Sequence, residues 1–207
     1  MRCVPFVLLA VMAVCYLIIQ HMKHTPGYGR SPKIAVKCAA TLMAVFTALL
    51  GCLHAPAPGR FLILAGLCAG TAADGVLIVH FVAGGALFAL GHILYILAFC
   101  LMGGVSWGSL WVFLGLMGLF SLGLARFRRR MGRRAPLFAA YAAVLMAMVS
   151  LAAFQHPLFA AGAALFAFSD ALLFYLLMER DHVRLDYISL GAYYLGQFLL
   201  ALGTWAA

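Results

Sequence analysis

Three formally charged side chains lie well inside apolar stretches of the sequence: Lys37, Asp74 and Asp170. An ionisable group at membrane depth is costly unless it is paired, and such residues commonly mark functional sites or proton and ion pathways. Carboxyl groups can donate and accept protons, and a lysine can pair with them. These residues therefore indicate either acid–base catalysis or a proton or cation relay.

Neutral polar residues accompany the charged ones. His92 and Tyr95 are three residues apart and share one face of a helix, and Tyr193 and Gln197, four residues apart, share another. A single buried histidine or tyrosine commonly makes an interhelical hydrogen bond, and one aspartate beside one lysine can be a structural ion pair. The whole set, to which Tyr194 also belongs, favours a functional site.

The composition shows which kind of element must position these residues. Hydrophobic residues make up 67% of the 207-residue chain and charged residues only 9%, whereas about a quarter of the residues of a soluble domain are charged. The apolar residues form continuous runs, while a membrane β-barrel alternates apolar and polar residues. We therefore expect an all-α protein, a polytopic transmembrane helix bundle of about eight spans in a single domain, 1–207.

Turn residues and charges divide the chain into eight apolar segments. The first could be mistaken for a signal peptide, but the run around Ala13–Cys15 is a poor cleavage site, so we expect it to remain as a span. Gly84-Gly85 and Gly103-Gly104 are predicted to form short hairpin connections. The predicted spans are 4–20, 33–51, 60–79, 84–101, 107–124, 136–154, 158–178 and 187–205.

Basic residues are distributed unequally over the connections between these spans. The odd-numbered connections share one side of the membrane and hold eleven Lys and Arg residues, against two on the other side. The positive-inside rule then places the odd-numbered connections in the cytoplasm and both termini outside it, and we expect the inner membrane of a bacterial cell. The eleven are Lys23, Arg30, Lys33, Arg126, Arg128, Arg129, Arg130, Arg133, Arg134, Arg180 and Arg184, and the two are Arg2 and Arg60.

The same parity predicts the depth of the polar residues. At 1.5 Å per residue, five of them lie about 6–12 Å from the cytoplasmic ends of their spans, which predicts a pocket open to the cytoplasmic leaflet. The basic segment Arg126–Arg134 is expected to contact anionic lipid headgroups rather than nucleic acid. The five residues are Lys37, Asp74, His92, Asp170 and Tyr193.

Short motifs surround these polar residues. They are Val36-Lys37-Cys38, Ala73-Asp74-Gly75-Val76-Leu77, Gly91-His92-Ile93-Leu94-Tyr95, Phe168-Ser169-Asp170-Ala171-Leu172 and Ala192-Tyr193-Tyr194-Leu195-Gly196-Gln197. In this order, over nearly the whole chain, they resemble the YhhN-like lysoplasmalogenase family of eight-span membrane proteins. Two departures are Ala73, where the family usually has glycine, and Leu176-Leu177, where it often has polar residues. The second departure bears on substrate preference more than on chemistry.

The resemblance implies hydrolysis of the vinyl-ether bond of lysoplasmalogens to a fatty aldehyde and glycerophosphoethanolamine or glycerophosphocholine. Vinyl ethers are hydrolysed by protonation at carbon, which needs a strong acid and produces an oxocarbenium ion. A carboxyl group in an apolar site favours its protonated form, and a second carboxylate can stabilise the cation and deprotonate water. On this basis Asp74 and Asp170 would form the catalytic pair, with either one as the acid.

The other polar residues are interpreted as substrate-binding. Lys37 and His92 would face the substrate phosphate or tune the carboxyl groups. The remaining ones would hydrogen-bond the glycerol and water. Asp74, His92 and Asp170 could supply metal ligands, but no tight metal-binding motif is present and we expect neither a metal nor another cofactor. The remaining substrate-binding residues are Tyr95, Ser169, Tyr193, Tyr194 and Gln197.

Two other functions use the same residues. The main alternative is a proton- or cation-coupled small-molecule transporter, in which the polar layer forms the relay. Transporters often have broken helices around a midplane site, whereas this layer lies off-centre and its spans lack paired Gly/Pro interruptions. The third is a non-catalytic lipid-binding or assembly protein. In liposomes, an enzyme releases aldehyde without a gradient, a transporter moves solute without product, and a binding protein does neither.

Overall fold

Helices account for almost all of residues 3–179 and 182–206, which are the residues that the computed structural model describes. This part of the chain forms eight α helices and one short 3-10 helix and is all-α, as expected. They are α1 (Val4–His24), α2 (Arg30–His54), α3 (Pro58–Val79), α4 (Phe81–Met102), α5 (Trp107–Met131), η1 (Gly132–Arg134), α6 (Ala135–Ala152), α7 (Pro157–Glu179) and α8 (Val183–Ala206).

Most of these helices are suited to a lipid environment. Within the described residues, six helical segments are long and apolar enough to cross a membrane, and one of them, Trp107–Ala152, contains both α5 and α6. The helix α8 is not among the six, because Tyr193, Tyr194 and Gln197 lower its mean hydropathy. The chain is therefore an integral, multi-pass membrane protein with a helical bundle.

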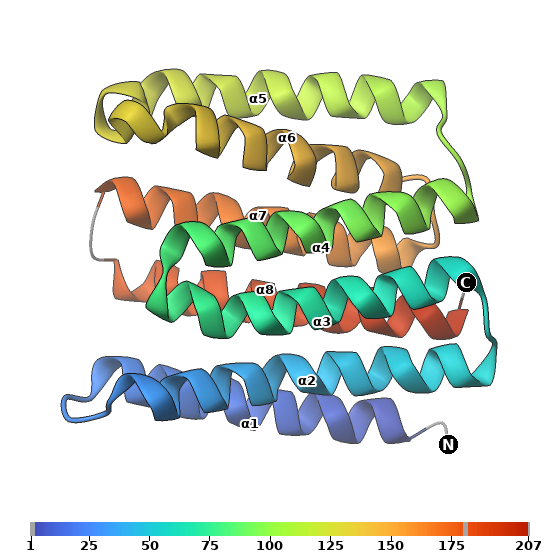
Figure 1. The fold of residues 1–207 in the computed structure, drawn as a ribbon, viewed down its shortest axis with the longest axis horizontal. Helices are drawn as coiled ribbons and strands as arrows, with labels where there is room; N and C mark the ends of the chain where they lie inside the picture. The colour runs from blue at the N-terminus through green and yellow to red at the C-terminus, as the bar shows by residue number, and fades with distance from the viewer. Residues whose placement is uncertain (1–2, 180–181, 207) are drawn as a thin grey trace.

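The odd-numbered connections lie together at one end of the bundle. In Figure 1 the turns between α1 and α2, α3 and α4, and α5 and α6 are at the left, as are the facing ends of α7 and α8. The arginine-rich η1 is at this end as well, so the connections that the charge pattern grouped together lie at one end of the bundle. Arg2 and Arg180 of the charge pattern lie outside the described residues. Which side of the membrane this end faces stays a prediction.

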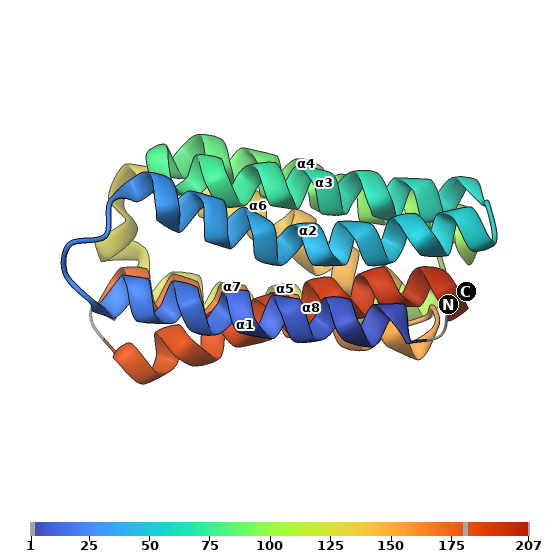
Figure 2. The ribbon, with the colours of Figure 1, turned by 90° about the horizontal axis from the view of Figure 1, so that it is seen from below.

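The helices pack in two layers. Seen from below, α2, α3 and α4 form one layer and α1, α8 and α7 the other, with α8 in contact with α1, α2, α3 and α7 (Figure 2). The helix α6 contacts α4 and α7, and α5 lies outside it at the edge of the bundle (Figure 1). The helix α6 therefore connects the two layers, because α4 belongs to one and α7 to the other.

The predicted hairpin at Gly84-Gly85 is wrong. Both glycines lie inside α4, and the chain reverses at the single residue His80, whose extended backbone separates α3 from α4. The His80 ring accepts a hydrogen bond from the backbone N–H of Ala83 and caps α4. Gly84 instead allows close helix packing, since a Cβ there would lie 2.5 Å from Cα of Leu77. Gly103-Gly104 does connect α4 to α5, with Gly104 at a φ of +72°.

A second close contact joins α7 to α8. A Cβ on Gly162 would lie 2.9 Å from the carbonyl oxygen of Gly196, and a Cβ on Gly196 would lie 2.9 Å from that of Gly162. Small residues at such crossings let helix backbones approach in lipid, where packing rather than the hydrophobic effect holds helices together. This contact fixes α8, and with it Tyr193 and Gln197, against α7.

Substitution by alanine should change the stability of the protein differently at a closely packed glycine and at a glycine with open space around it. Gly162→Ala should lower the free energy of unfolding by about 1–3 kcal/mol, because the new methyl group meets backbone atoms that cannot move aside. Gly115→Ala in α5 is the matched control: a Cβ there has nothing within 4 Å, so it should be neutral or slightly stabilising. Unfolding by SDS titration in mixed micelles measures both, and equal effects would contradict the close α7–α8 contact.

Candidate functional site

A cavity of about 790 Å³ opens between the helix layers. Lys37 of α2, Asp74 of α3, Asp170 of α7 and Tyr193 of α8 all line it. Its other walls are mostly apolar, and along α4 its lining runs from Phe81 to Ile93, which is about 18 Å of helix at 1.5 Å per residue. The structure therefore brings both aspartates to one apolar space.

Asp74 is held by charged and polar partners from two other helices. Its Oδ1 is 2.9 Å from Nζ of Lys37, and its Oδ2 accepts a 2.8 Å hydrogen bond from the hydroxyl of Tyr193. Gln197, one turn further along α8, donates a 3.1 Å hydrogen bond to that hydroxyl. Asp74 has no exposed surface, and 15% of the Lys37 side chain is exposed. This first cluster is an ion pair with a tyrosine on its second oxygen.

Asp170 has different partners. The hydroxyl of Tyr141, on α6, donates a 2.5 Å hydrogen bond to its Oδ2, and Nε2 of His92, on α4, is 3.2 Å from the same hydroxyl. Tyr141 therefore links His92 to Asp170, so that side chains of α4, α6 and α7 meet in this cluster. Among the described residues, Nδ1 of His92 has no hydrogen-bond partner. This second cluster contains no lysine or arginine.

Aromatic rings separate the two clusters. The ring of Phe166 lies 5.3 Å from that of Tyr193 and 4.7 Å, edge to face, from that of His92. Phe88 packs against Phe166 and Tyr193 as well. Within the described part of the chain, Asp74 and Asp170 make no hydrogen bond with each other. Each carboxyl group instead has its own tyrosine, and the two face a shared cavity.

A family comparison covers the part of the chain that holds both clusters. The model of the YhhN family matches residues 32–204, which run from α2 into α8 and include every residue of both clusters. The chain belongs to the YhhN family. That family includes lysoplasmalogenases. No curated protein and no solved structure matches the chain.

Three of the predicted substrate-binding residues in this YhhN protein make their contacts outside the two clusters. The ring of Tyr95 packs against α3 where Gly66 leaves room for it, and the ring of Tyr194 lies edge to face with that of Tyr16, 6.2 Å away. Neither hydroxyl has a hydrogen-bond partner within the described residues. Ser169 borders the cavity but donates its hydroxyl to the backbone carbonyl of Ser189, so it joins α7 to α8.

The polar residues of the site also include members that the sequence analysis missed. Tyr141 bridges His92 and Asp170, and Lys23 forms a 2.6 Å ion pair with Asp186 on the cavity wall. Tyr141 had a detectable signal, because it is the one polar side chain in the apolar run between Arg134 and Ser150. Lys23 and Asp186 lie at helix ends, where charges are common, and carried no such signal.

The two clusters do not resemble a metal centre. Across residues 3–179 and 182–206, no three His, Cys, Asp or Glu side chains are placed to hold a metal ion. The ligands that the sequence could have supplied, Asp74, His92 and Asp170, are divided between the clusters. The polar groups present are instead acids, hydroxyls and an amine, which suit proton transfer and charge stabilisation.

Removing only the lysine of the Lys37–Asp74 pair should lower the free energy of unfolding more than removing both charges. Lys37→Met leaves a buried carboxylate without its cation and should lower the free energy of unfolding by about 3–5 kcal/mol. The double variant Lys37→Met with Asp74→Asn removes both charges and should recover most of that loss. Denaturation of the purified protein measures both, and a double variant no more stable than the single one would contradict a coupled pair.

Proposed function

We propose that this YhhN protein is a membrane hydrolase of lysoplasmalogens. It cleaves the vinyl-ether bond and releases a fatty aldehyde with glycerophosphoethanolamine or glycerophosphocholine. The observation that carries the proposal is that two carboxyl groups with unlike partners, Asp74 and Asp170, line one apolar cavity. Membership of a family that includes lysoplasmalogenases supports it.

The partners assign different roles to the two carboxyl groups. Asp74 faces the ammonium group of Lys37 and accepts from Tyr193, so it serves as the carboxylate. Asp170 contacts only neutral groups through Tyr141, and a buried carboxyl without a cation favours its protonated form. Asp170 is therefore the general acid of the proposal. Unlike environments around two carboxyls supply one acid and one base in other hydrolases too.

The reaction then needs one proton donor, one carboxylate and one water. Asp170 transfers its proton to the alkenyl carbon distant from the ether oxygen, which leaves an oxocarbenium ion at the neighbouring carbon. The Asp74 carboxylate stabilises this cation and takes a proton from the water that attacks it, giving a hemiacetal. The hemiacetal then breaks its bond to the glycerol oxygen, which takes up a proton as the hydroxyl loses one, and both carboxyl groups return to their starting states.

The cavity suits a lipid with one long chain. Its lining includes apolar residues of α4 and α6 that are exposed on the bundle surface, such as Leu90, Ile93 and Leu137. Because that surface faces lipid, an alkenyl chain can enter sideways from the leaflet. In this proposal Lys37 tunes Asp74 and His92 positions Tyr141. The end of the bundle that carries the arginines lies at the cytoplasmic leaflet.

Removing either carboxyl group should abolish aldehyde release. Asp74→Asn and Asp170→Asn should each lower kcat by about 10²–10⁴-fold, the usual contribution of acid–base catalysis. Tyr194→Phe is the control, because its hydroxyl has no partner among the described residues and its loss should leave the rate unchanged. An aldehyde-release assay on purified, folded variants measures this. Near-normal activity in both aspartate variants would contradict the mechanism.

The product should record protonation at carbon. In D₂O, the aldehyde should carry one deuterium on the carbon next to the carbonyl, because Asp170 exchanges with solvent and delivers its deuteron there. Immediate reduction to the alcohol followed by mass spectrometry measures the label. Unlabelled aldehyde incubated with the protein in D₂O controls for later exchange. An aldehyde without deuterium would exclude proton transfer to carbon.

A further inference from the structure

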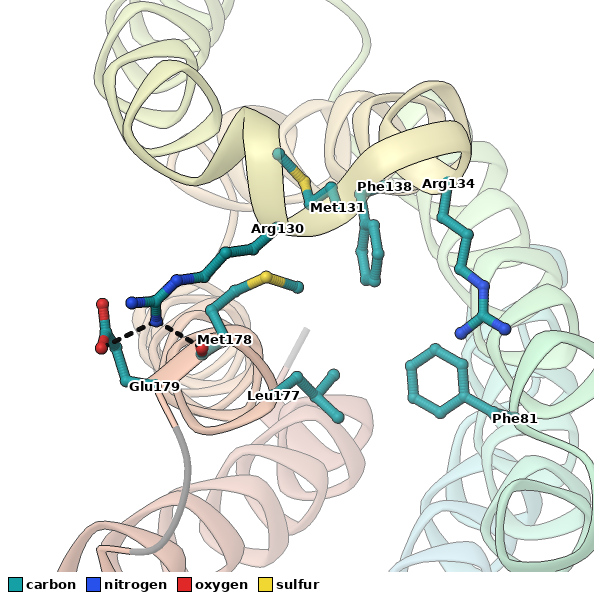
Figure 3. A pocket seen from close by; sticks show the side chains of 8 residues that line it. All are labelled: Phe81, Arg130, Met131, Arg134, Phe138, Leu177, Met178 and Glu179. Carbon is teal, nitrogen blue, oxygen red and sulfur yellow. Dashed lines mark hydrogen bonds and ion pairs between the residues drawn. The ribbon is translucent and has the colours of Figure 1, made fainter.

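A second cavity, of about 640 Å³, lies at the arginine-bearing end of the bundle (Figure 3). Figure 3 shows two guanidinium groups on opposite sides of it, with aromatic and aliphatic side chains between them. We call it the arginine pocket. It is lined by Phe81, Arg130, Met131, Arg134, Phe138, Leu177, Met178 and Glu179.

The two arginines of this pocket have different surroundings. Nη1 of Arg130 lies 2.8 Å from a carboxylate oxygen of Glu179 and donates a 2.6 Å hydrogen bond to the carbonyl of Met178. Its charge is therefore matched, and it fixes the end of α7. Within the described residues, Arg134 has no hydrogen-bond or ion-pair partner, and its side chain points toward Phe81 on the same side of the pocket (Figure 3). Among residues 3–179 and 182–206, no anionic side chain therefore pairs with the charge of Arg134.

The arginine pocket continues into the cavity that Asp74 and Asp170 line, which we call the main cavity. Phe81, Phe138 and Leu177 line both. Phe138 and Tyr141 are three residues apart and share one face of α6, and Arg134, the last residue of η1, directly precedes this helix. Tyr141 follows Arg134 by seven positions, which corresponds to about 10 Å at 1.5 Å per residue. A glycerol backbone together with the reach of an arginine side chain can span such a separation.

We propose that Arg134 binds the phosphate of the lysophospholipid substrate, a phosphodiester with a single negative charge. This inference rests on the proposed function, and it names the group that orients the lipid. With the phosphate at Arg134 and the chain in the main cavity, the ether bond lies beside Tyr141 and Asp170. The guanidinium group suits this role because it can donate two parallel hydrogen bonds to phosphate oxygens.

The test compares a substrate that carries the phosphodiester headgroup with one that lacks the whole headgroup. On alkenyl lysophospholipid, Arg134→Gln should raise KM about tenfold or more, the usual effect of losing a charge-assisted hydrogen bond, with kcat within about twofold. On 1-alkenylglycerol, which lacks the phosphate, Arg134→Gln and the unaltered protein should have the same KM. A rise in KM on both substrates would overturn the proposal.

Arg133→Gln is the matched control variant. Arg133 is also exposed and also lies in η1, but it does not line the pocket. General attraction of lipid headgroups to the basic segment would depend equally on both arginines, because it acts over about 8–10 Å in salt. Equal rises in KM for Arg133→Gln and Arg134→Gln would therefore overturn the specific site. Arg134→Lys should recover part of the affinity, since it keeps the charge without the paired donors.

A binding measurement separates this proposal from the hydrolase proposal. Alkyl lysophospholipid lacks the vinyl ether, and its binding to the full chain in detergent can be followed by calorimetry without any turnover. Arg134→Gln should weaken this binding about tenfold and leave the binding of the matching alkylglycerol unchanged. This result with no aldehyde release from the unaltered protein would refute the hydrolase but keep the phosphate site. Equal binding of alkyl lysophospholipid by both proteins would overturn the site alone.

Discussion

The ion pair between Lys37 and Asp74 is the interaction on which the centre of this bundle depends. Charges inside a membrane are tolerated when they face a partner across a helix interface, and here the partner helices are neighbours within one layer. Tyr193 and Gln197 extend the pair to the opposite layer. The orientation of α2, α3 and α8 about their own axes is thus fixed by a chain of polar contacts, and the cavity follows from that orientation.

The second carboxyl group has no comparable cation. Asp170 is reached through Tyr141 and His92, which come from α6 and α4. The same apolar cavity is therefore bordered by two unlike carboxyl groups. Asp74 is paired with a cation, whereas Asp170, within the described residues, has only a neutral hydrogen-bond partner. This difference between the clusters allows one carboxyl group to act as an acid and the other as a base. The presence of two acids alone would not do so.

Much of the architecture was predictable from the sequence, because lipid imposes simple rules. Continuous apolar runs predicted the eight helices, and the distribution of arginine and lysine predicted that the odd-numbered connections share one end. The pairing of side chains was less predictable. Periodicity shows which residues share a helix face but not which helix that face meets, so Tyr141 was missed as the partner of Asp170 and Tyr95 was expected in a site from which it points away. The α3–α4 turn was misplaced because His80 carries no turn signature, whereas Gly84-Gly85 does.

The turn at His80 also bears on how the chain enters the bilayer. With a single residue between them, α3 and α4 form a tight helical hairpin that can insert as one unit during synthesis. Lys37 precedes Asp74 along the chain, so its helix leaves the ribosome first. His92 and Tyr141 likewise precede Asp170. A polar partner of each acid is thus synthesised before the acid itself, and Tyr193 and Gln197 of α8 follow last.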